Sequence, residues 1–179
     1  MGKSFAVVCA SNQNRSMEAH HVLSKRGFSV SSYGTGSAVR LPGPSIDKPN
    51  IYQFGTPYEY MYQDLFMKDP KNRKIKLAPE QWYTNAKENF DVIITCEERC
   101  FDAIYLVDRG EERNIPVHVI NIDIKDNHED AMLAGRAILQ LAQTIDNEKS
   151  KDLDQEITNI IEEWQQKFKY ELLHCVGYF

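Results

Sequence analysis

Residues 5–19 read Phe-Ala-Val-Val-Cys-Ala-Ser-Asn-Gln-Asn-Arg-Ser-Met-Glu-Ala, and this stretch decides the fold. Phe5 to Val8 form a short apolar run, as expected of a strand that is covered on both faces. From Ser16 onward the apolar residues have helical spacing, and Gly27 is placed to end that helix. A loop between a buried strand and a helix N-terminus presents free backbone N–H groups and the positive end of the helix dipole. It therefore suits an anion.

A cysteine begins this loop and an arginine ends it. If the loop curls around a tetrahedral oxyanion, its amides point inward and Arg15 can grip two oxygens at once. Cys9 then lies beneath as the attacking atom, and the positive field favours its thiolate. Ser16 can hydrogen-bond that sulfur and steady it as a leaving group. The pattern predicts a phosphatase loop that forms a phosphocysteine, with the phosphate held by Ala10, Ser11, Asn12, Gln13, Asn14 and Ser16.

The plainer interpretation treats Cys9 as a small hydrophobe at the end of a strand. The apolar strand before it, the serine directly after Arg15 and the helix that follows favour the functional interpretation. The other cysteines, at positions 96, 100 and 175, show no disulfide or zinc spacing. They indicate a reducing, intracellular compartment and no metal site. Cys96 and Cys100 are interpreted as packing residues.

The chain has 179 residues and a hydrophobic share of 42%, which fits one α/β domain over residues 1–179. Its formal charge of -5 argues against a general nucleic-acid surface. No apolar stretch approaches bilayer length, and the N-terminus has no signal-peptide pattern. We therefore expect neither direct nucleic-acid binding nor a membrane partner.

Strand and helix patterns alternate along the chain. This alternation predicts a doubly wound, mainly parallel sheet of about five strands, with helices on both faces and the site at the strands' carboxyl ends. Further strands are expected over residues 28–33, 91–96, 116–123 and 170–179, and further helices over residues 58–68, 97–107, 131–145 and 153–169, with a short one from Pro79.

Two segments do not follow this alternation. Residues 38–49 contain Leu41-Pro42-Gly43-Pro44, and the prolines and glycine predict a stiff loop without regular structure. Residues 71–76 are a basic run, which we interpret as a solvated surface in preference to a targeting or phosphate-reading patch.

Cleaving a phosphate from an alkyl oxygen requires a proton donor, because an alkoxide is a poor leaving group. The strand over residues 116–123 leads into two candidates, Asp123 and Asp126, at the expected edge of the sheet. Either could donate the proton and then activate water. Asp126 could equally be a helix N-cap, with Glu129 completing a capping box. The histidines at positions 118, 128 and 174 are interpreted as structural.

These motifs resemble the Ssu family of RNA polymerase II C-terminal-domain phosphatases over almost the whole chain. The stretches that carry the resemblance are residues 7–20, 23–28, 34–36, 41–44, 47–50, 96–99 and 126–129. That family is related in fold to low-molecular-weight tyrosine phosphatases. Asn14, however, stands where those enzymes carry a second loop cysteine, and the acid motif is Asp-Asn-His instead of Asp-Pro-Tyr.

The resemblance implies a protein serine phosphatase that acts on the fifth position of the polymerase heptad and reads a following cis proline. It implies work in the nucleus, in transcription termination and mRNA 3′-end processing, on a symplekin-type scaffold, with no metal or other cofactor. By the family pattern Cys9 is the nucleophile, Arg15 the phosphate clamp and Asp126 the general acid. The substrate peptide would be held by Arg40, Leu41, Pro42 and Gly43.

One departure is that the chain is shorter than the family pattern between Met67 and Ile75, which bears on peptide selectivity. Two other classes of protein remain open. One is a phosphopeptide-binding module of weak turnover. The other is an arsenate-reductase-like redox enzyme, which needs resolving thiols near Cys9. The cysteines available for that are Cys96, Cys100 and Cys175.

Overall fold

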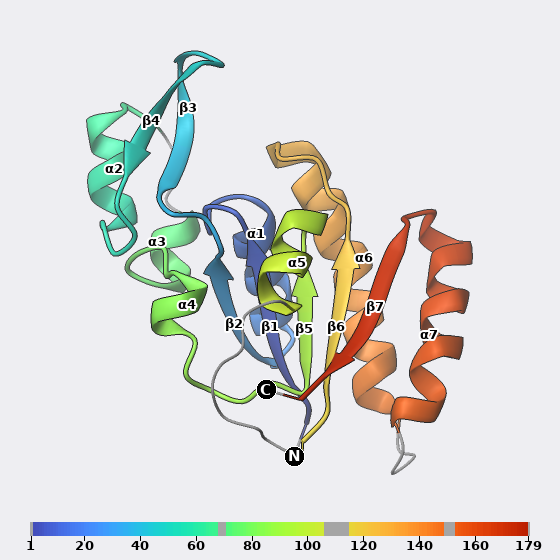
Figure 1. The fold of residues 1–179 in the computed structure, drawn as a ribbon. Helices are drawn as coiled ribbons and strands as arrows, with labels where there is room; N and C mark the ends of the chain where they lie inside the picture. Colours follow the sequence, from blue (N-terminus) through green and yellow to red (C-terminus); the bar gives the residue numbers. More distant parts are fainter. Residues whose placement is uncertain (1, 68–70, 106–114, 149–152, 179) are drawn as a thin grey trace.

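The computed structural model describes residues 2–67, 71–105, 115–148 and 153–178. Within these residues the core is a five-stranded sheet in the order β2-β1-β5-β6-β7. The first four strands in this order are parallel to one another, and β7 pairs antiparallel with β6. This confirms the predicted mainly parallel α/β sheet (Figure 1). The strands are β1 (Ser4–Cys9), β2 (Ser29–Gly34), β5 (Val92–Thr95), β6 (Val117–Ile122) and β7 (Leu172–Gly177).

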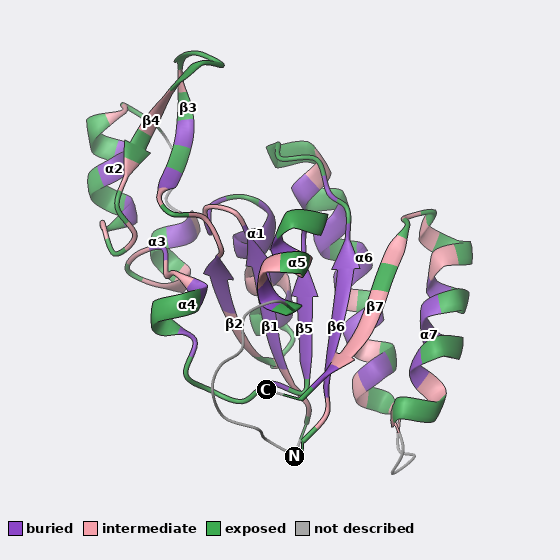
Figure 2. Cartoon of the chain, in the orientation of Figure 1, coloured by how far each residue is buried: buried purple, intermediate pink, exposed green. Residues whose placement is uncertain are grey.

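Helices cover both faces of this sheet (Figure 1). On one face, residues of α1 (Arg15–Lys25), α6 (His128–Asn147) and α7 (Leu153–Phe168) share a core with β1, β5 and β6. On the other, residues of α4 (Trp82–Asn85) and α5 (Glu98–Tyr105) pack on the opposite side chains of the same strands. The central strands are consequently buried except at Ser4, the first residue of β1, whereas β7 at the edge is mostly half-buried (Figure 2).

Residues 38–49 do not form the irregular loop that their prolines and glycine predicted. They contain most of an antiparallel hairpin, β3 (Val39–Ser45) with β4 (Lys48–Tyr52), which projects beyond the carboxyl end of β2 (Figure 1). The prediction was wrong because a two-stranded ribbon has two free edges, where a residue without an N–H is tolerated. A register shift between Leu41 and Ser45 accommodates the two prolines of β3.

The basic run is also less solvated than expected. It forms α3 (Lys71–Ile75), in which Asn72 is buried and donates to the Gln13 carbonyl at 2.9 Å. Lys76 is half-buried and donates to the Ser32 carbonyl at 2.6 Å. Only Arg73 and Lys74 are exposed as predicted. The inward-pointing groups are held there because they donate to backbone carbonyls of the loop after β1 and of β2.

The remaining elements differ mainly at their ends. The helix expected over residues 58–68 is α2 (Tyr58–Asp64), with Pro57 at the N-cap position and no side-chain cap hydrogen bond. The helix expected from Pro79 begins only at Trp82. Residue 68 and residues 106–107, the predicted ends of two helices, lie outside the described residues, as does part of the shortened segment between Met67 and Ile75. No helix in the described part of the chain has the length and apolar character needed to cross a membrane.

Candidate active site

The loop after β1 holds Cys9 against the start of α1. Cys9 is the last residue of β1 and is 2% exposed, and its Sγ lies 3.0 Å from the Ser16 hydroxyl. Arg15 begins α1, so the backbone amides between the two residues lie at a helix N-terminus. A hydroxyl at this distance can donate to a thiolate, and an N-terminal helix field favours the same charge.

Asn12 keeps this loop in shape from the inside. Its φ is +53°, in the left-handed region that asparagine tolerates better than most residues. Its side-chain amide donates to Ser16 and Ser32, and its Oδ1 accepts from the Glu80 N–H at 3.0 Å. Its own carbonyl accepts from the Tyr58 hydroxyl at 2.6 Å. The Asn12 side chain therefore lies beneath the loop backbone and supports it, and does not face a ligand.

Arg15 is buried, and its guanidinium contacts backbone carbonyls, Glu97 and Asp126. Nη1 donates to the carbonyls of Ile124 at 3.0 Å and Cys96 at 3.4 Å, and pairs with Glu97 at 3.3 Å. Among the described residues, the buried Nε has no hydrogen-bond partner, although it lies 3.5 Å from Asp126 Oδ1. Burial alone would lower the pKa of Arg15, but the charges of Cys9, Asp126 and Glu97 raise it above its ordinary value. The side chain is a permanent cation with a donor left for an incoming oxyanion.

Asp126 faces the loop from the segment between β6 and α6. Its Oδ1 lies 3.5 Å from Arg15 Nε and 3.4 Å from Asn14 Nδ2, while 59% of its side chain remains exposed. The N-cap of α6 is Asn127, whose Oδ1 accepts from the Asp130 N–H at 2.9 Å. The capping box that the sequence suggested for Asp126 and Glu129 is therefore absent, which leaves the Asp126 carboxyl free for another task.

A cavity of about 210 Å³ opens over Cys9. Asp126 lies at its mouth, and the hairpin supplies Arg40, Leu41 and Pro42. The Arg40 N–H also donates to the Ser11 hydroxyl at 3.1 Å, which ties the hairpin to the loop. The lining residues are Cys9, Ser11, Gln13, Asn14, Arg40, Leu41, Pro42, Pro49 and Asp126. This volume suits a phosphate with a short peptide side chain.

Several residues that the sequence placed in the site do not line this cavity. Ala10 uses its carbonyl to accept from the Gly36 N–H at 2.9 Å, and Asn12 and Ser16 lie beneath the loop. Gly43 allows the two strands of the hairpin to approach each other, because an added Cβ would come within 1.8 Å of the Lys48 carbonyl oxygen. Asp123 is exposed and does not line the cavity.

Sequence reasoning did not anticipate four supporting residues. They are Tyr58, Tyr62, Asn72 and Glu97. Tyr58, Tyr62 and Asn72 donate to Asn12 and Gln13 of the loop, Tyr62 to Gln13 Oε1 at 3.2 Å, and Glu97 pairs with Arg15. The aromatic residues of the segment over 58–68 were the available signal. Tyrosines spaced four apart put two hydroxyls on one helix face, where they can reach a neighbouring loop.

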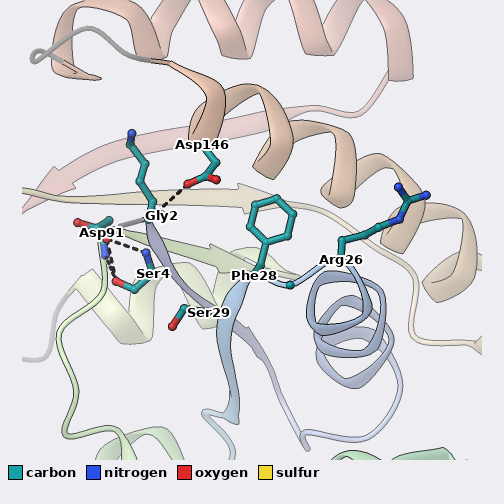
Figure 3. A pocket seen from close by; sticks show the side chains of 9 residues that line it. Gly2, Ser4, Arg26, Phe28, Ser29, Asp91 and Asp146 are labelled. Carbon is teal, nitrogen blue, oxygen red and sulfur yellow. Dashed lines mark hydrogen bonds between the residues drawn. The ribbon is translucent and has the colours of Figure 1, made fainter.

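A larger hollow, of about 740 Å³, lies at the opposite end of the sheet (Figure 3). Its carboxylates already have partners, because Asp146 accepts from the Lys3 N–H and Asp91 accepts from Ser4. Its described lining residues include no cysteine. Among the described residues there is also no cluster of three or more His, Cys, Asp or Glu side chains suited to a metal ion.

Comparisons with known proteins agree with this geometry. A family model described as Ssu72-like protein matches residues 3–179. The cattle protein named as the SSU72 phosphatase of the RNA polymerase II C-terminal domain is 48% identical over 189 residues, covering 97% of this chain and 96% of that one.

Two solved structures extend the comparison. One is D. melanogaster Ssu72 with symplekin, bound to a cis peptidomimetic CTD peptide phosphorylated on serine five. It has a TM-score of 0.88 and 42% identity, with 99% of each chain covered. The other, YfkJ from Bacillus subtilis, has a TM-score of 0.51 at 16% identity, with 84% of this chain and 98% of that one covered. That likeness concerns the fold alone, which is of the low-molecular-weight tyrosine phosphatase type.

Proposed function

This chain belongs to the Ssu72-like family, and from that premise we propose that it is a cysteine-dependent protein phosphatase. Its substrate is the RNA polymerase II C-terminal domain phosphorylated on the serine at the fifth position of the heptad. The single observation that carries the chemistry is that Cys9 and Asp126 line one cavity, with Arg15 Nε 3.5 Å from the Asp126 carboxylate. Residues 1–179 act as one phosphatase domain.

The reaction has two steps in this site. The Cys9 thiolate attacks phosphorus while the loop amides and Arg15 stabilise the charge that spreads over the phosphoryl oxygens. Asp126, when protonated, donates to the departing serine oxygen. In the second step Asp126 accepts a proton from water, which attacks the phosphocysteine. Sγ then leaves as a thiolate that the Ser16 hydroxyl can stabilise at 3.0 Å.

The hairpin supplies the peptide-binding side of the cavity. Leu41, Pro42 and Pro49 offer apolar surface beside the phosphate position, and Arg40 adds a positive charge. A cis X-Pro bond is a minority form in flexible peptides, at roughly 10–30%. A narrow apolar wall that accepts only the cis form would give selectivity, and the D. melanogaster relative was solved with a cis peptidomimetic.

The proposal extends to the protein's surroundings. The D. melanogaster relative was solved with symplekin, so a symplekin-type scaffold is the partner expected here. A polymerase C-terminal domain as substrate places the activity in the nucleus, in transcription termination and mRNA 3′-end processing. Neither direct nucleic-acid binding nor a membrane is needed for this role.

Phosphate release from two heptad peptides tests the proposal. We expect the peptide phosphorylated at its fifth residue to be hydrolysed much faster than one phosphorylated at its second. Cys9→Ser should bind phosphate but release none from either peptide, and a chelator should have no effect. Equal rates on both peptides would overturn the substrate assignment. Activity that survives in Cys9→Ser would overturn the nucleophile assignment.

The same assay addresses the two other classes. A binding module of weak turnover would hold the phosphopeptide without releasing phosphate from it or from an aryl phosphate. A redox enzyme of the arsenate-reductase type would reduce arsenate with an added thiol. We expect rapid aryl phosphate hydrolysis and no arsenate reduction.

A further inference from the structure

Two buried thiols that the proposed reaction does not use lie close to Cys9. Cys96 directly follows β5, and Cys100 lies in α5; both have no exposed surface. β1 and β5 are parallel and in register up to the pair Val8 and Thr95. The Cys96 N–H then donates to the Val8 carbonyl at 2.9 Å. Continuing this register by one residue places Cys96 beside Cys9.

The two side chains also point to the same face of the sheet. Cys9 and Cys96 belong to one buried cluster, together with alternating residues of both strands such as Val7 and Ile94. Neighbouring strands are about 4.8 Å apart. This spacing lies inside the Cα–Cα range of roughly 4.4–6.8 Å over which a disulfide can form. Cys9 is also the last residue of its strand, where the chain turns into the loop and can adjust.

Cys100 is near the site but held differently. Its sulfur lies 3.1 Å from the Thr35 hydroxyl and 3.5 Å from Glu97 Oε1. It comes from a helix on the other side of the strand end and is not part of the cluster that contains Cys9 and Cys96. Cys100 is therefore a buried thiol of the same chemistry in a different position.

We infer that Cys96 is a resolving thiol, and that a hydroperoxide converts Cys9 and Cys96 into a disulfide. The Cys9 thiolate attacks one peroxide oxygen, forming an S–O bond and breaking the O–O bond. With one proton taken up, Cys9 becomes a sulfenic acid and, with hydrogen peroxide as oxidant, water leaves. The Cys96 sulfur then attacks the Cys9 sulfur, and the Cys96 proton leaves with the hydroxyl as a second water. Two thiols are oxidised and one peroxide is reduced to two waters.

The order of these steps follows from the surroundings of each sulfur. Burial raises the pKa of Cys96 well above its ordinary value, and the charge of Cys9 raises it further. Cys96 is therefore a poor target for peroxide in solution, whereas Cys9 lines an open cavity. The inference rests on the proposed function insofar as Cys9 is the reactive thiolate. The disulfide would draw Sγ away from Ser16, so the oxidised protein should be inactive until it is reduced.

The experiment treats the full-length protein with hydrogen peroxide, blocks free thiols and identifies linked peptides by mass spectrometry without reduction. In the unmodified sequence we expect a Cys9–Cys96 linkage and recovery of most activity after dithiothreitol. In Cys96→Ala, Cys9 should pass on to sulfinic and sulfonic acids, so recovered activity should be several-fold lower. Cys100→Ala is the matched control and should behave like the unmodified protein.

The readouts separate this inference from the proposed function. Linkage is scored by mass, and phosphatase activity is measured on untreated samples of each variant. A Cys9–Cys100 linkage, no linkage, or equal recovery in Cys96→Ala and the unmodified protein would overturn the inference even if the enzyme is active. If Cys96→Ala does not fold, Cys96→Ser serves instead, since it removes the sulfur and keeps the volume. A chain that links Cys9 to Cys96 but never releases phosphate would overturn the proposed function alone.

Discussion

The Arg15 guanidinium has two roles, one in holding the protein's own structure and one in binding substrate. Nη1 is engaged by two backbone carbonyls and Glu97, so the side chain cannot rotate freely. In the part of the chain that the structure describes, the buried Nε makes no hydrogen bond and is ion-paired with Asp126 at 3.5 Å. A buried donor without a partner is costly in a folded protein. An oxyanion above Cys9 that reached Nε would give this donor a hydrogen bond, which would favour binding.

Asp126 gives the sharpest test at this scale. Asp126→Asn removes the proton donor and keeps the shape, so hydrolysis of phosphoserine peptides should fall by about 100-fold or more. An aryl phosphate should lose far less, because its leaving group needs little protonation. Steady-state kcat on both substrates measures the difference. Equal losses on the two substrates would indicate a structural role for Asp126.

The elements around the loop help to fix its shape. α2 places two tyrosine hydroxyls against Asn12 and Gln13, and α3 adds the amide of Asn72. The hairpin also contacts the loop, through the Arg40 N–H and the Ser11 hydroxyl. α2 and the hairpin share one apolar cluster, so the loop is held by packed elements that lie outside the five-stranded sheet.

Tyr58→Phe tests the support from α2. The change leaves the buried Asn12 carbonyl without its 2.6 Å donor, which should cost about 1–3 kcal/mol in the free energy of unfolding. We expect kcat on an aryl phosphate to fall as well, because the loop loses its fixed geometry. Urea unfolding and kcat are the measurements. Tyr60→Phe, on the exposed side of the same helix, is the control and should change neither.

Gly43→Ala tests the hairpin. Its Cβ would meet the Lys48 carbonyl oxygen at 1.8 Å, so β3 and β4 must separate there. We expect KM for the phosphopeptide to rise several-fold, while kcat on a small aryl phosphate changes little because the Cys9 loop is intact. The exposed Ser45→Ala on the same strand serves as control. A loss of aryl phosphate activity equal to the peptide loss would mean that the hairpin supports the loop itself.

At the scale of the whole molecule, buried and half-buried histidines make stability depend on pH. Burial, together with the charge of Lys76, lowers the pKa of His20 to about 4. Burial also lowers the pKa values of His118 and His174, which contact each other at 3.1 Å. Below a pH of about 6.5 the unfolded chain takes up protons at these histidines that the folded chain does not. Stability that is present at neutral pH is therefore lost on acidification.

We expect the free energy of unfolding to fall between pH values of about 6.5 and 5, by about 2 kcal/mol from His20 alone. Urea titrations across that range measure it. His20→Gln should give a shallower dependence on pH, because it removes the titrating group and keeps a polar partner for Ser32. An unchanged slope in this variant would show that His20 does not contribute.

The sequence by itself determined the elements whose patterns are local. The apolar runs predicted the central strands, the helical spacing predicted α6 and α7, and the Cys9 to Arg15 spacing predicted a phosphate loop at a helix N-terminus. Only the tertiary structure decided three other points: the pairing of residues 39–52 into a hairpin, the use of Asn127 in place of Asp126 as helix cap, and the position of Cys96 beside Cys9. The reason is physical. Burial and helix periodicity act along neighbouring residues, whereas strand pairing, caps and thiol contacts depend on partners brought from elsewhere in the chain.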